Sequence, residues 1–360
     1  MRDRDKAGLA ASMDTRVFGE VEAQRVHEVT LRSDTGAEAN VITWGAVLRD
    51  LIVPIGARGP QRVVLGLNTL EDYIRHSPYF GGIAGRYGNR IRNGRFRLGE
   101  RTFQLSLNDG GHSLHGGTRG FSSRPWQLAG SDGSSVALTL LSPDGDEGYP
   151  GNLMVSCIYK LVGSTLRVEL MATGDAPTPV NLCQHSYFNL DGSPSILDHT
   201  LQLASDFYTP TDAELIPTGE VRAVAGTVYD FRERRLVRMT DESAGRLCRY
   251  DMNFVLRRDR LIPSGMDERP LAFAGILASD ASRVSLEVWT TEPGLQVYDG
   301  WMTDVPVPGR DGRRYGAYAG MCLEPQYFPD SPNRPHFPDA ILRPGEVYRQ
   351  ITEYRFATVI

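Results

Sequence analysis

The sequence lacks the features that mark several large classes of protein. No apolar run approaches the roughly 18 residues that a membrane-spanning helix needs, and the first 15 residues hold no apolar segment typical of a signal peptide. Basic residues are not in excess, because the formal net charge is −5 and the isoelectric point is near 5.9. This balance argues against a polyanionic partner. We therefore expect a cytoplasmic protein that binds neither nucleic acid nor a membrane.

Cysteine is also scarce. The chain has four cysteines, which are widely separated and include no C-x-x-C pair, so neither a zinc ribbon nor a redox motif is predicted. Each cysteine lies among apolar neighbours, and we expect reduced thiols in the core. The four are Cys157, Cys183, Cys248 and Cys322.

Helical periodicity is almost absent, apart from a possible short turn near residues 69–74. Apolar residues instead alternate along 136–140, 166–170 and 284–288, as in strands with one buried face. Turn residues separate such runs, for example Asp144-Gly145 and Asp191-Gly192, and the chain holds 38 glycines and 22 prolines. This pattern predicts an all-β protein, a large antiparallel β-sandwich.

The sequence shows no internal repeat, no low-complexity tract and no linker. We expect residues 1–16 to form a flexible N-terminal tail and residues 17–360 to form one β-sandwich domain. The polar segment 257–271 is interpreted as a long surface loop of that domain.

Two glycine-rich segments carry polar side chains. Residues 81–90 lack the spacing of a phosphate-binding loop, but they deliver Asn89 and Arg90, which suit the recognition of neighbouring hydroxyl groups. Residues 108–117 hold His112 and His115, and their glycines disfavour the helix on which such a spacing would bind a metal. A histidine between glycines is instead open to close approach by a ligand.

Two further segments place an ionisable group in apolar surroundings. His185 lies in a strand-like run beside aromatic residues, which suit the apolar face of a pyranose ring. Glu324 follows an apolar run, so the end of a strand would hold its carboxylate partly buried and raise its pKa towards that of a general base. Taken alone, each of Arg90, His185 and Glu324 is more simply interpreted as a structural residue.

Taken together and in this order, the segments resemble the aldose 1-epimerase (galactose mutarotase) family over about residues 17–356. The motifs that carry the resemblance are VVLGL at 63–67, LEDY at 70–73, GRYGNRI at 85–91, SLHGG at 113–117, EGYPG at 147–151, HSYFNL at 185–190, TTEPGLQ at 290–296, and Glu324 with FPDSPN at 328–333. Each motif is weak alone, whereas the ordered series is specific.

The resemblance implies a large β-sandwich with an open sugar-binding cleft on its concave sheet. It further implies that Glu324 is the general base, that His185 is the general acid and that His115 assists near the ring oxygen. It also implies a set of residues that bind sugar hydroxyls, namely Asn89, Arg90, Asp251 and Gln296. The base and the acid would lie on opposite sides of the C1–O5 unit, and the reaction needs no cofactor and no metal.

The implied activity is interconversion of the anomers of a free aldose, a hexose such as galactose or glucose, by a monomer or homodimer. Two alternatives remain open: a hexose-6-phosphate 1-epimerase, and a noncatalytic carbohydrate-binding protein on the same scaffold. The chain departs from the family pattern at Met252, at Asp299 and Trp301, and at Pro325. We expect these departures to border the sugar pocket and to affect the choice of substrate.

Overall fold

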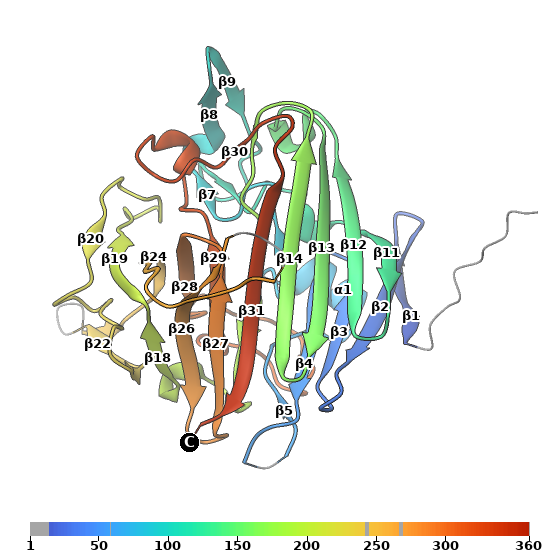
Figure 1. Cartoon of the computed structure of the whole chain (residues 1–360), viewed down its shortest axis with the longest axis vertical. Helices are drawn as coiled ribbons and strands as arrows, with labels where there is room; N and C mark the ends of the chain where they lie inside the picture. Colours follow the sequence, from blue (N-terminus) through green and yellow to red (C-terminus); the bar gives the residue numbers. More distant parts are fainter. Residues whose placement is uncertain (1–13, 58, 242–244, 266–268, 360) are drawn as a thin grey trace, which may run out of the picture.

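Antiparallel strands make up most of the protein (Figure 1). A computed structural model describes residues 14–57, 59–241, 245–265 and 269–359. Within these ranges there is one α-helix, α1 (Leu70–His76), and none of the described helices is long and apolar enough to cross a membrane. The prediction of an all-β fold is confirmed.

The largest sheet has ten strands. Its order is β11 (Gln127–Ser131), β12 (Ser135–Ser142), β13 (Leu153–Val162), β14 (Thr165–Gly174), β31 (Tyr348–Thr358), β27 (Val284–Thr290), β26 (Leu271–Ser279), β18 (Thr200–Leu203) and β21 (Arg235–Leu236), with β25 (Leu261–Ile262) paired to β26. The three alternating runs of the sequence form β12, β14 and β27, and their apolar residues are buried as predicted.

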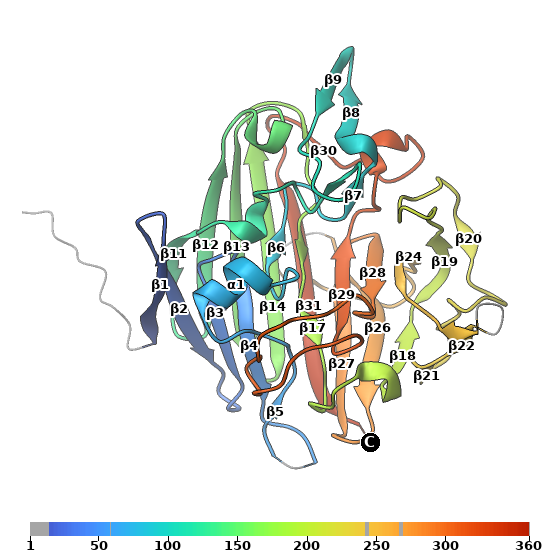
Figure 2. The ribbon, with the colours of Figure 1, turned by 180° about the vertical axis from the view of Figure 1, so that it is seen from behind.

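Two further sheets lie behind the large one in Figure 1 and face the viewer in Figure 2, which shows the opposite side. The first has the order β1 (Thr15–Val21), β2 (Gln24–Arg32), β3 (Glu38–Ile42), β4 (Val47–Val53) and β5 (Gln61–Arg62). The second has the order β17 (Tyr187–Phe188), β29 (Met321–Gln326), β28 (Gly294–Tyr298), β24 (Asp251–Leu256), β19 (Ser205–Thr209) and β20 (Arg222–Ala223). One apolar core contains residues of all three sheets, which makes the architecture a β-sandwich.

Short elements connect the sheets. The strand pairs are β6 (Ile83–Ala84) with β16 (Cys183–Gln184), β7 (Arg90–Ile91) with β10 (Ser113–Leu114), β8 (Arg95–Leu98) with β9 (Arg101–Gln104), β15 (Thr178–Pro179) with β30 (Ile341–Leu342), and β22 (Thr240–Asp241) with β23 (Arg246–Leu247). The 3₁₀ turns are η1 (Arg92–Gly94), η2 (Phe121–Ser123), η3 (Asp146–Gly148), η4 (Ile196–Asp198) and η5 (Ser331–Asn333).

The fold confirms some of the local predictions from the sequence and corrects others. Strand β1 begins at Thr15 and pairs with β2, so residues 15 and 16 lie in a sheet and not in the expected tail, while residues 1–13 lie outside the described part. The expected turn near 69–74 is helix α1. Thr69 and Asp72 form a capping box at its N-terminus. The expected loop 257–271 contains β25, and its residues 266–268 are not described. All four cysteines are buried and free, as predicted.

Arg86 joins the glycine-rich segment to the end of the large sheet. Its guanidinium is buried and donates to the Ser142 hydroxyl, the Thr178 hydroxyl and the carbonyls of Ser142, Pro143 and Pro150, at 2.8–3.2 Å. Burial lowers the pKa of Arg86 to about 10. The planar fork of donors therefore cross-links the loop that leads to Asn89 with β12 and the turn that follows it.

Replacing Arg86 by lysine tests this cross-link. One ammonium group reaches fewer of these acceptors, so we expect Arg86→Lys to lower the free energy of unfolding by about 2–3 kcal/mol, since each buried polar group left unpaired costs about 1–3 kcal/mol. Equilibrium unfolding in urea measures the change. The control is Arg97→Lys in the exposed part of β8, for which we expect a change below about 0.5 kcal/mol. Equal unfolding midpoints for the two variants would contradict this assignment.

Candidate functional site

Three neighbouring strands of the six-stranded sheet carry polar residues on one face. In the register, Asp251 of β24 pairs with Tyr298 of β28, and Gln296 of β28 pairs with Glu324 of β29. Side chains two residues apart on a strand share a face, so these residues lie on the same side of the sheet. The opposite face of the same strands is apolar and belongs to the sandwich core. Strand alternation thus separates the core from a polar surface.

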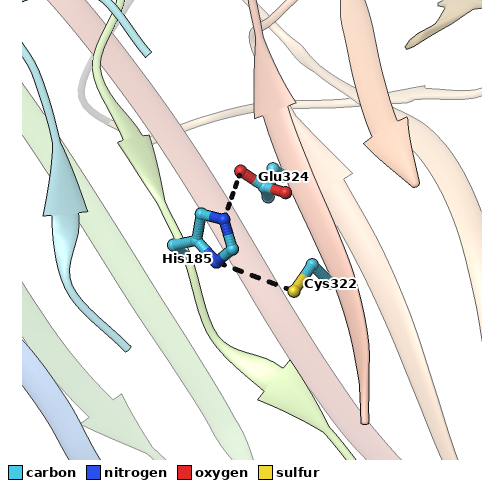
Figure 3. A group of neighbouring side chains, drawn as sticks. All are labelled: His185, Cys322 and Glu324. Atoms are coloured by element: carbon cyan, nitrogen blue, oxygen red, sulfur yellow. Dashed lines mark hydrogen bonds and ion pairs between the residues drawn. The ribbon is translucent and has the colours of Figure 1, made fainter. Parts of the chain in front are cut away.

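His185 lies between β16 and β17, directly beside this polar face. Its backbone amide donates to Gly82 and its carbonyl accepts from Gly81, at 2.9 Å each, while Tyr187 pairs with Cys322 of β29. The imidazole lies between two side chains of β29, as Figure 3 shows. Its Nε2 is 3.6 Å from Oε2 of Glu324, and its Nδ1 is 3.6 Å from Sγ of Cys322.

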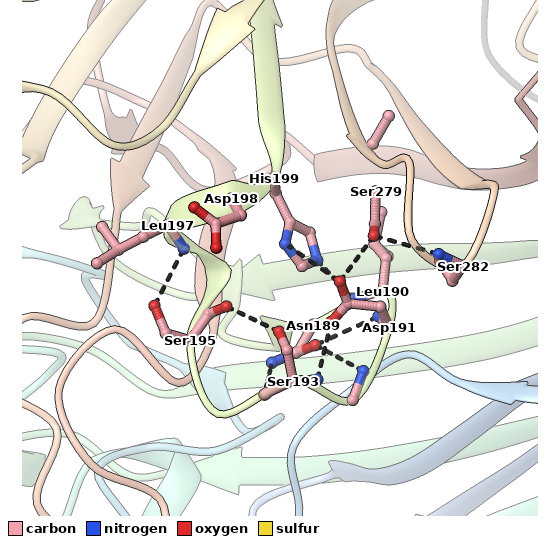
Figure 4. A network of polar contacts seen from close by, with 12 residues as sticks. Asn189, Leu190, Asp191, Ser193, Ser195, Leu197, Asp198, His199, Ser279 and Ser282 are labelled. Atoms are coloured by element: carbon pink, nitrogen blue, oxygen red, sulfur yellow. Dashed lines mark hydrogen bonds and ion pairs between the residues drawn. The ribbon is translucent and has the colours of Figure 1, made fainter.

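The segment after β17 is held in place by a polar network (Figure 4). The side-chain Nδ2 of Asn189 donates to the carbonyls of Ser193 and Ala319 at 2.8 Å, and Nε2 of His199 accepts from the backbone N–H of Leu190 at 3.0 Å. The Ser279 hydroxyl, at the end of β26, donates to Asp191 at 2.7 Å. This network ties the chain that carries His185 to the large sheet.

His115 and Asn89 hold each other in left-handed backbone conformations. Their φ angles are 52° and 63°, and the backbone N–H of His115 donates to the Asn89 carbonyl at 3.1 Å. In return, the backbone N–H of Asn89 donates to Nδ1 of His115 at 3.1 Å. Because Nδ1 accepts, the proton of the neutral ring is on Nε2. Gly116 permits this packing, since a Cβ there would lie 1.8 Å from the carbonyl oxygen of Gly85.

The two histidines of segment 108–117 bind different partners. Nδ1 of His112 accepts from the backbone N–H of Asn93 at 2.9 Å, and Nε2 of His112 lies 3.5 Å from the Glu214 carboxylate. His112 therefore braces η1, whereas His115 faces the site.

Arg90 is fixed by carboxylates on both sides. Its Nε donates to Asp109 at 2.7 Å, and its Nη1 lies 3.9 Å from Asp251. The other carboxylate oxygen of Asp251 accepts from Nε2 of Gln296 at 2.6 Å. The side-chain oxygen of Asn89 accepts from the backbone N–H of Arg90 at 2.8 Å, so its NH₂ group is the part that can donate to a ligand.

These groups surround a pocket of about 180 Å³. Five of the seven predicted site residues line it, namely Asn89, Arg90, His115, His185 and Asp251. The other two, Gln296 and Glu324, are buried neighbours on adjacent strands and lie outside the lining. Tyrosines contribute much of the remaining wall: Tyr79, Tyr187 and Tyr298. Aromatic faces beside hydroxyl-binding groups suit a pyranose ring.

Burial controls the protonation of the central groups. It raises the pKa of Glu324 to about 8, with the charge of Asp251 adding to the effect, and it lowers the pKa of His185 to about 4. Burial also lowers the pKa of His115 well below its usual value, and the charges of His185 and Arg90 act in the same direction. Each buried group therefore favours its neutral form.

The sequence interpretation placed the carboxylate and the imidazole on opposite sides of the sugar's C1–O5 unit. In the structure Nε2 of His185 lies 3.6 Å from Oε2 of Glu324, which leaves no room for a sugar ring between them. The reason is the pairing of Tyr187 with Cys322, which holds His185 against the strand that carries Glu324.

Two of the departures from the family pattern lie away from the pocket, which corrects the expectation that they border it. Met252 follows Asp251 and Pro325 follows Glu324, and adjacent residues of a strand point to opposite faces. Met252 accordingly belongs to the apolar core. Pro325 is buried, and its carbonyl accepts from Gln350 of β31 at 2.6 Å.

Asp299 and Trp301 shape the turn after β28. Asp299 is fully buried and accepts from the backbone N–H groups of Tyr250 at 3.0 Å and Trp301 at 3.2 Å. Burial raises its pKa to about 7. The indole of Trp301 lies 4.2 Å from the guanidinium of Arg249. Met302 and Thr303, which follow in this turn, line the pocket.

Sequence reasoning missed three residues that contact the side chains of the site. Tyr79 packs on the rings of His115 and His185, with centroids 4.6 and 5.6 Å apart, and Asp109 orients Arg90. Cys322 contacts His185. Asp109 could have been predicted as a site residue, because it lies in the same segment as His115. Tyr79 and Cys322 could not, because only the fold brings them to the histidines.

The chain resembles known proteins in both sequence and structure. A family model described as aldose 1-epimerase matches residues 27–355. The chain is 40% identical to galactose mutarotase of Bos taurus, with 96% of this chain and 99% of that protein covered. It is 36% identical to aldose 1-epimerase of Escherichia coli, with 91% and 94% covered. An aldose epimerase homologue from C. elegans has a similar crystal structure, with a TM-score of 0.85, 30% identity, and 92% of this chain and 99% of that chain covered.

Proposed function

The chain belongs to the aldose 1-epimerase family, and from this premise we propose that it interconverts the anomers of a free hexose with Glu324 as general base and His185 as general acid. The curated relatives support aldose 1-epimerase activity, which is an isomerase reaction. The observation that carries the assignment of roles is the buried contact between Glu324 and His185 beneath a pocket lined by groups that bind hydroxyls.

The reaction requires two coordinated proton transfers. The Glu324 carboxylate removes the proton of the anomeric hydroxyl while Nε2 of the protonated His185 gives its proton to the ring oxygen, and the C1–O5 bond breaks to leave an aldehyde. Rotation about C1–C2 presents the other face of the carbonyl. The ring oxygen then attacks that face, its proton returns to His185, and Glu324 gives its proton to the new anomeric oxygen.

The burial of both groups favours this exchange. The tautomer that reacts is the charged one, carboxylate and imidazolium, which is the minor form of the resting pair, and after ring opening both members are neutral. Because burial favours the neutral form of each group, proton transfer to the sugar relieves an unfavourable pair of charges. His115, with its proton on Nε2, serves as a neutral donor near the ring oxygen.

The charge of the pocket favours a neutral sugar over a sugar phosphate. Arg90 is the basic side chain of the lining, and the carboxylates of Asp109 and Asp251 lie on either side of it. A phosphate dianion would need cations that are not already paired. Arg90, Asp251, Asn89 and Gln296 are therefore assigned to the hydroxyl groups of a free hexose such as galactose or glucose.

All seven site residues come from one chain, so a monomer or a homodimer would be competent. Four buried free thiols are typical of a protein kept in a reducing compartment, which supports a cytoplasmic location.

Replacing Glu324 by glutamine tests the role of the base. The amide keeps the shape of the side chain but does not accept the proton, so we expect anomer exchange to fall by about 10²–10⁴-fold while sugar binding persists. NMR exchange spectroscopy on galactose measures the rate above the spontaneous reaction, and calorimetry measures binding. The matched control is Glu292→Gln, another buried glutamate whose pKa burial raises to about 7 and which lies outside the pocket. Near-normal exchange in Glu324→Gln would refute the assigned base.

The pH dependence tests the shared proton. Between about pH 4 and about pH 8 the pair carries one proton, and the ratio of its two tautomers does not change with pH. We expect kcat/KM to be level in this range, to fall above it as the pair loses its only proton, and to fall below it as a second proton neutralises the base. Activity that keeps rising well above pH 8 would show that the reaction needs no acid from the pair.

A further inference from the structure

One side chain beside the reacting pair has no part in the reaction. Cys322 precedes Glu324 by two residues on β29, and its Sγ lies 3.6 Å from Nδ1 of His185. Figure 3 shows the imidazole between the thiol and the carboxylate. One ligand atom from each of the three side chains lies within 4.8 Å of the other two, and all three residues are buried.

These distances are close to those of a zinc site. A tetrahedral zinc ion with a Zn–N bond of about 2.1 Å and a Zn–S bond of about 2.3 Å holds its nitrogen and sulfur about 3.6 Å apart. Nδ1 of His185 and Sγ of Cys322 already have that separation. The Glu324 carboxylate supplies the third candidate ligand, because one atom from each of the three residues lies within 4.8 Å of the other two.

The chemistry of the three ligands selects a particular class of metal. A thiolate with an imidazole suits borderline and soft ions such as Zn²⁺, whereas Mg²⁺ and Ca²⁺ prefer oxygen ligands alone. Because His185 lines the pocket, an ion would enter from the side by which a sugar enters. The fourth ligand would be a water molecule on that side.

We propose that His185, Cys322 and Glu324 form an inhibitory zinc site. On binding, the Cys322 thiol releases its proton to solvent and the thiolate sulfur bonds Zn²⁺, while Glu324 and His185 give lone pairs to the ion. The two groups that move protons in the proposed reaction are then occupied, and the enzyme stops. The inhibition rests on the proposed function, whereas the metal site rests only on the geometry.

Cobalt is the probe that detects the site independently of activity. Co²⁺ takes the place of Zn²⁺ in such sites, and a thiolate ligand gives an intense near-ultraviolet charge-transfer band that oxygen and nitrogen ligands do not. We expect one equivalent of Co²⁺ to produce this band in the chelator-treated full chain, and Zn²⁺ to displace it. Cys322→Ser should abolish the band and weaken binding of Zn²⁺ by at least about tenfold, since even an outer partner of a metal ligand is worth about 10–100-fold.

Two controls keep the test specific. Cys248→Ser replaces a cysteine outside the group and should keep both the band and inhibition by Zn²⁺, and Mg²⁺ at the same concentration should leave anomer exchange unchanged. An active enzyme without a cobalt–thiolate band, or a Cys322→Ser variant that binds Zn²⁺ as tightly as the wild type, overturns the metal site. A chelator-treated enzyme that shows the band but no anomer exchange counts against the proposed function alone.

Discussion

The structure of the site depends on the burial of one carboxylate and one imidazole in contact with each other. Glu324 and His185 are 3.6 Å apart, and the exclusion of water shifts their pKa values in opposite directions, to about 8 and about 4. These shifts favour a pair that carries one proton at neutral pH, with both the carboxyl group and the imidazole uncharged. Ring opening removes one proton from the anomeric oxygen and supplies another to the ring oxygen. Such a pair can do both, and the total number of protons on the protein stays the same.

The contact exists because the fold separates two faces of one sheet. Strands β24, β28 and β29 turn apolar residues into the sandwich core and polar residues towards the pocket. The short pairing of β17 with β29 then sets His185 beside Glu324, and the network around Asn189 and His199 ties that segment to the large sheet. Residues 139 positions apart in the chain thus meet through strand register and not through a local motif.

Much of this was predictable from the sequence. Alternation of apolar residues fixed the strands β12, β14 and β27, and the ordered motifs led to the family and to seven site residues. The same alternation rule predicts that Met252 and Pro325 point towards the core, because each follows a strand residue, Asp251 or Glu324, that faces the pocket side. Other features depend on tertiary contacts alone. Neither the packing of Tyr79 on the two histidines nor the placement of Cys322 beside His185 has a local signal, because each joins segments that are distant in sequence.

The most direct test of the central claim is a crystal structure with a reducing hexose in the pocket. We expect the anomeric oxygen to lie within about 2.6–3.2 Å of the Glu324 carboxylate and the ring oxygen to lie at a similar distance from His185, with both groups on the same side of the sugar. A sugar bound with its anomeric carbon turned away from Glu324, towards Met302 and the pocket mouth, would contradict the account.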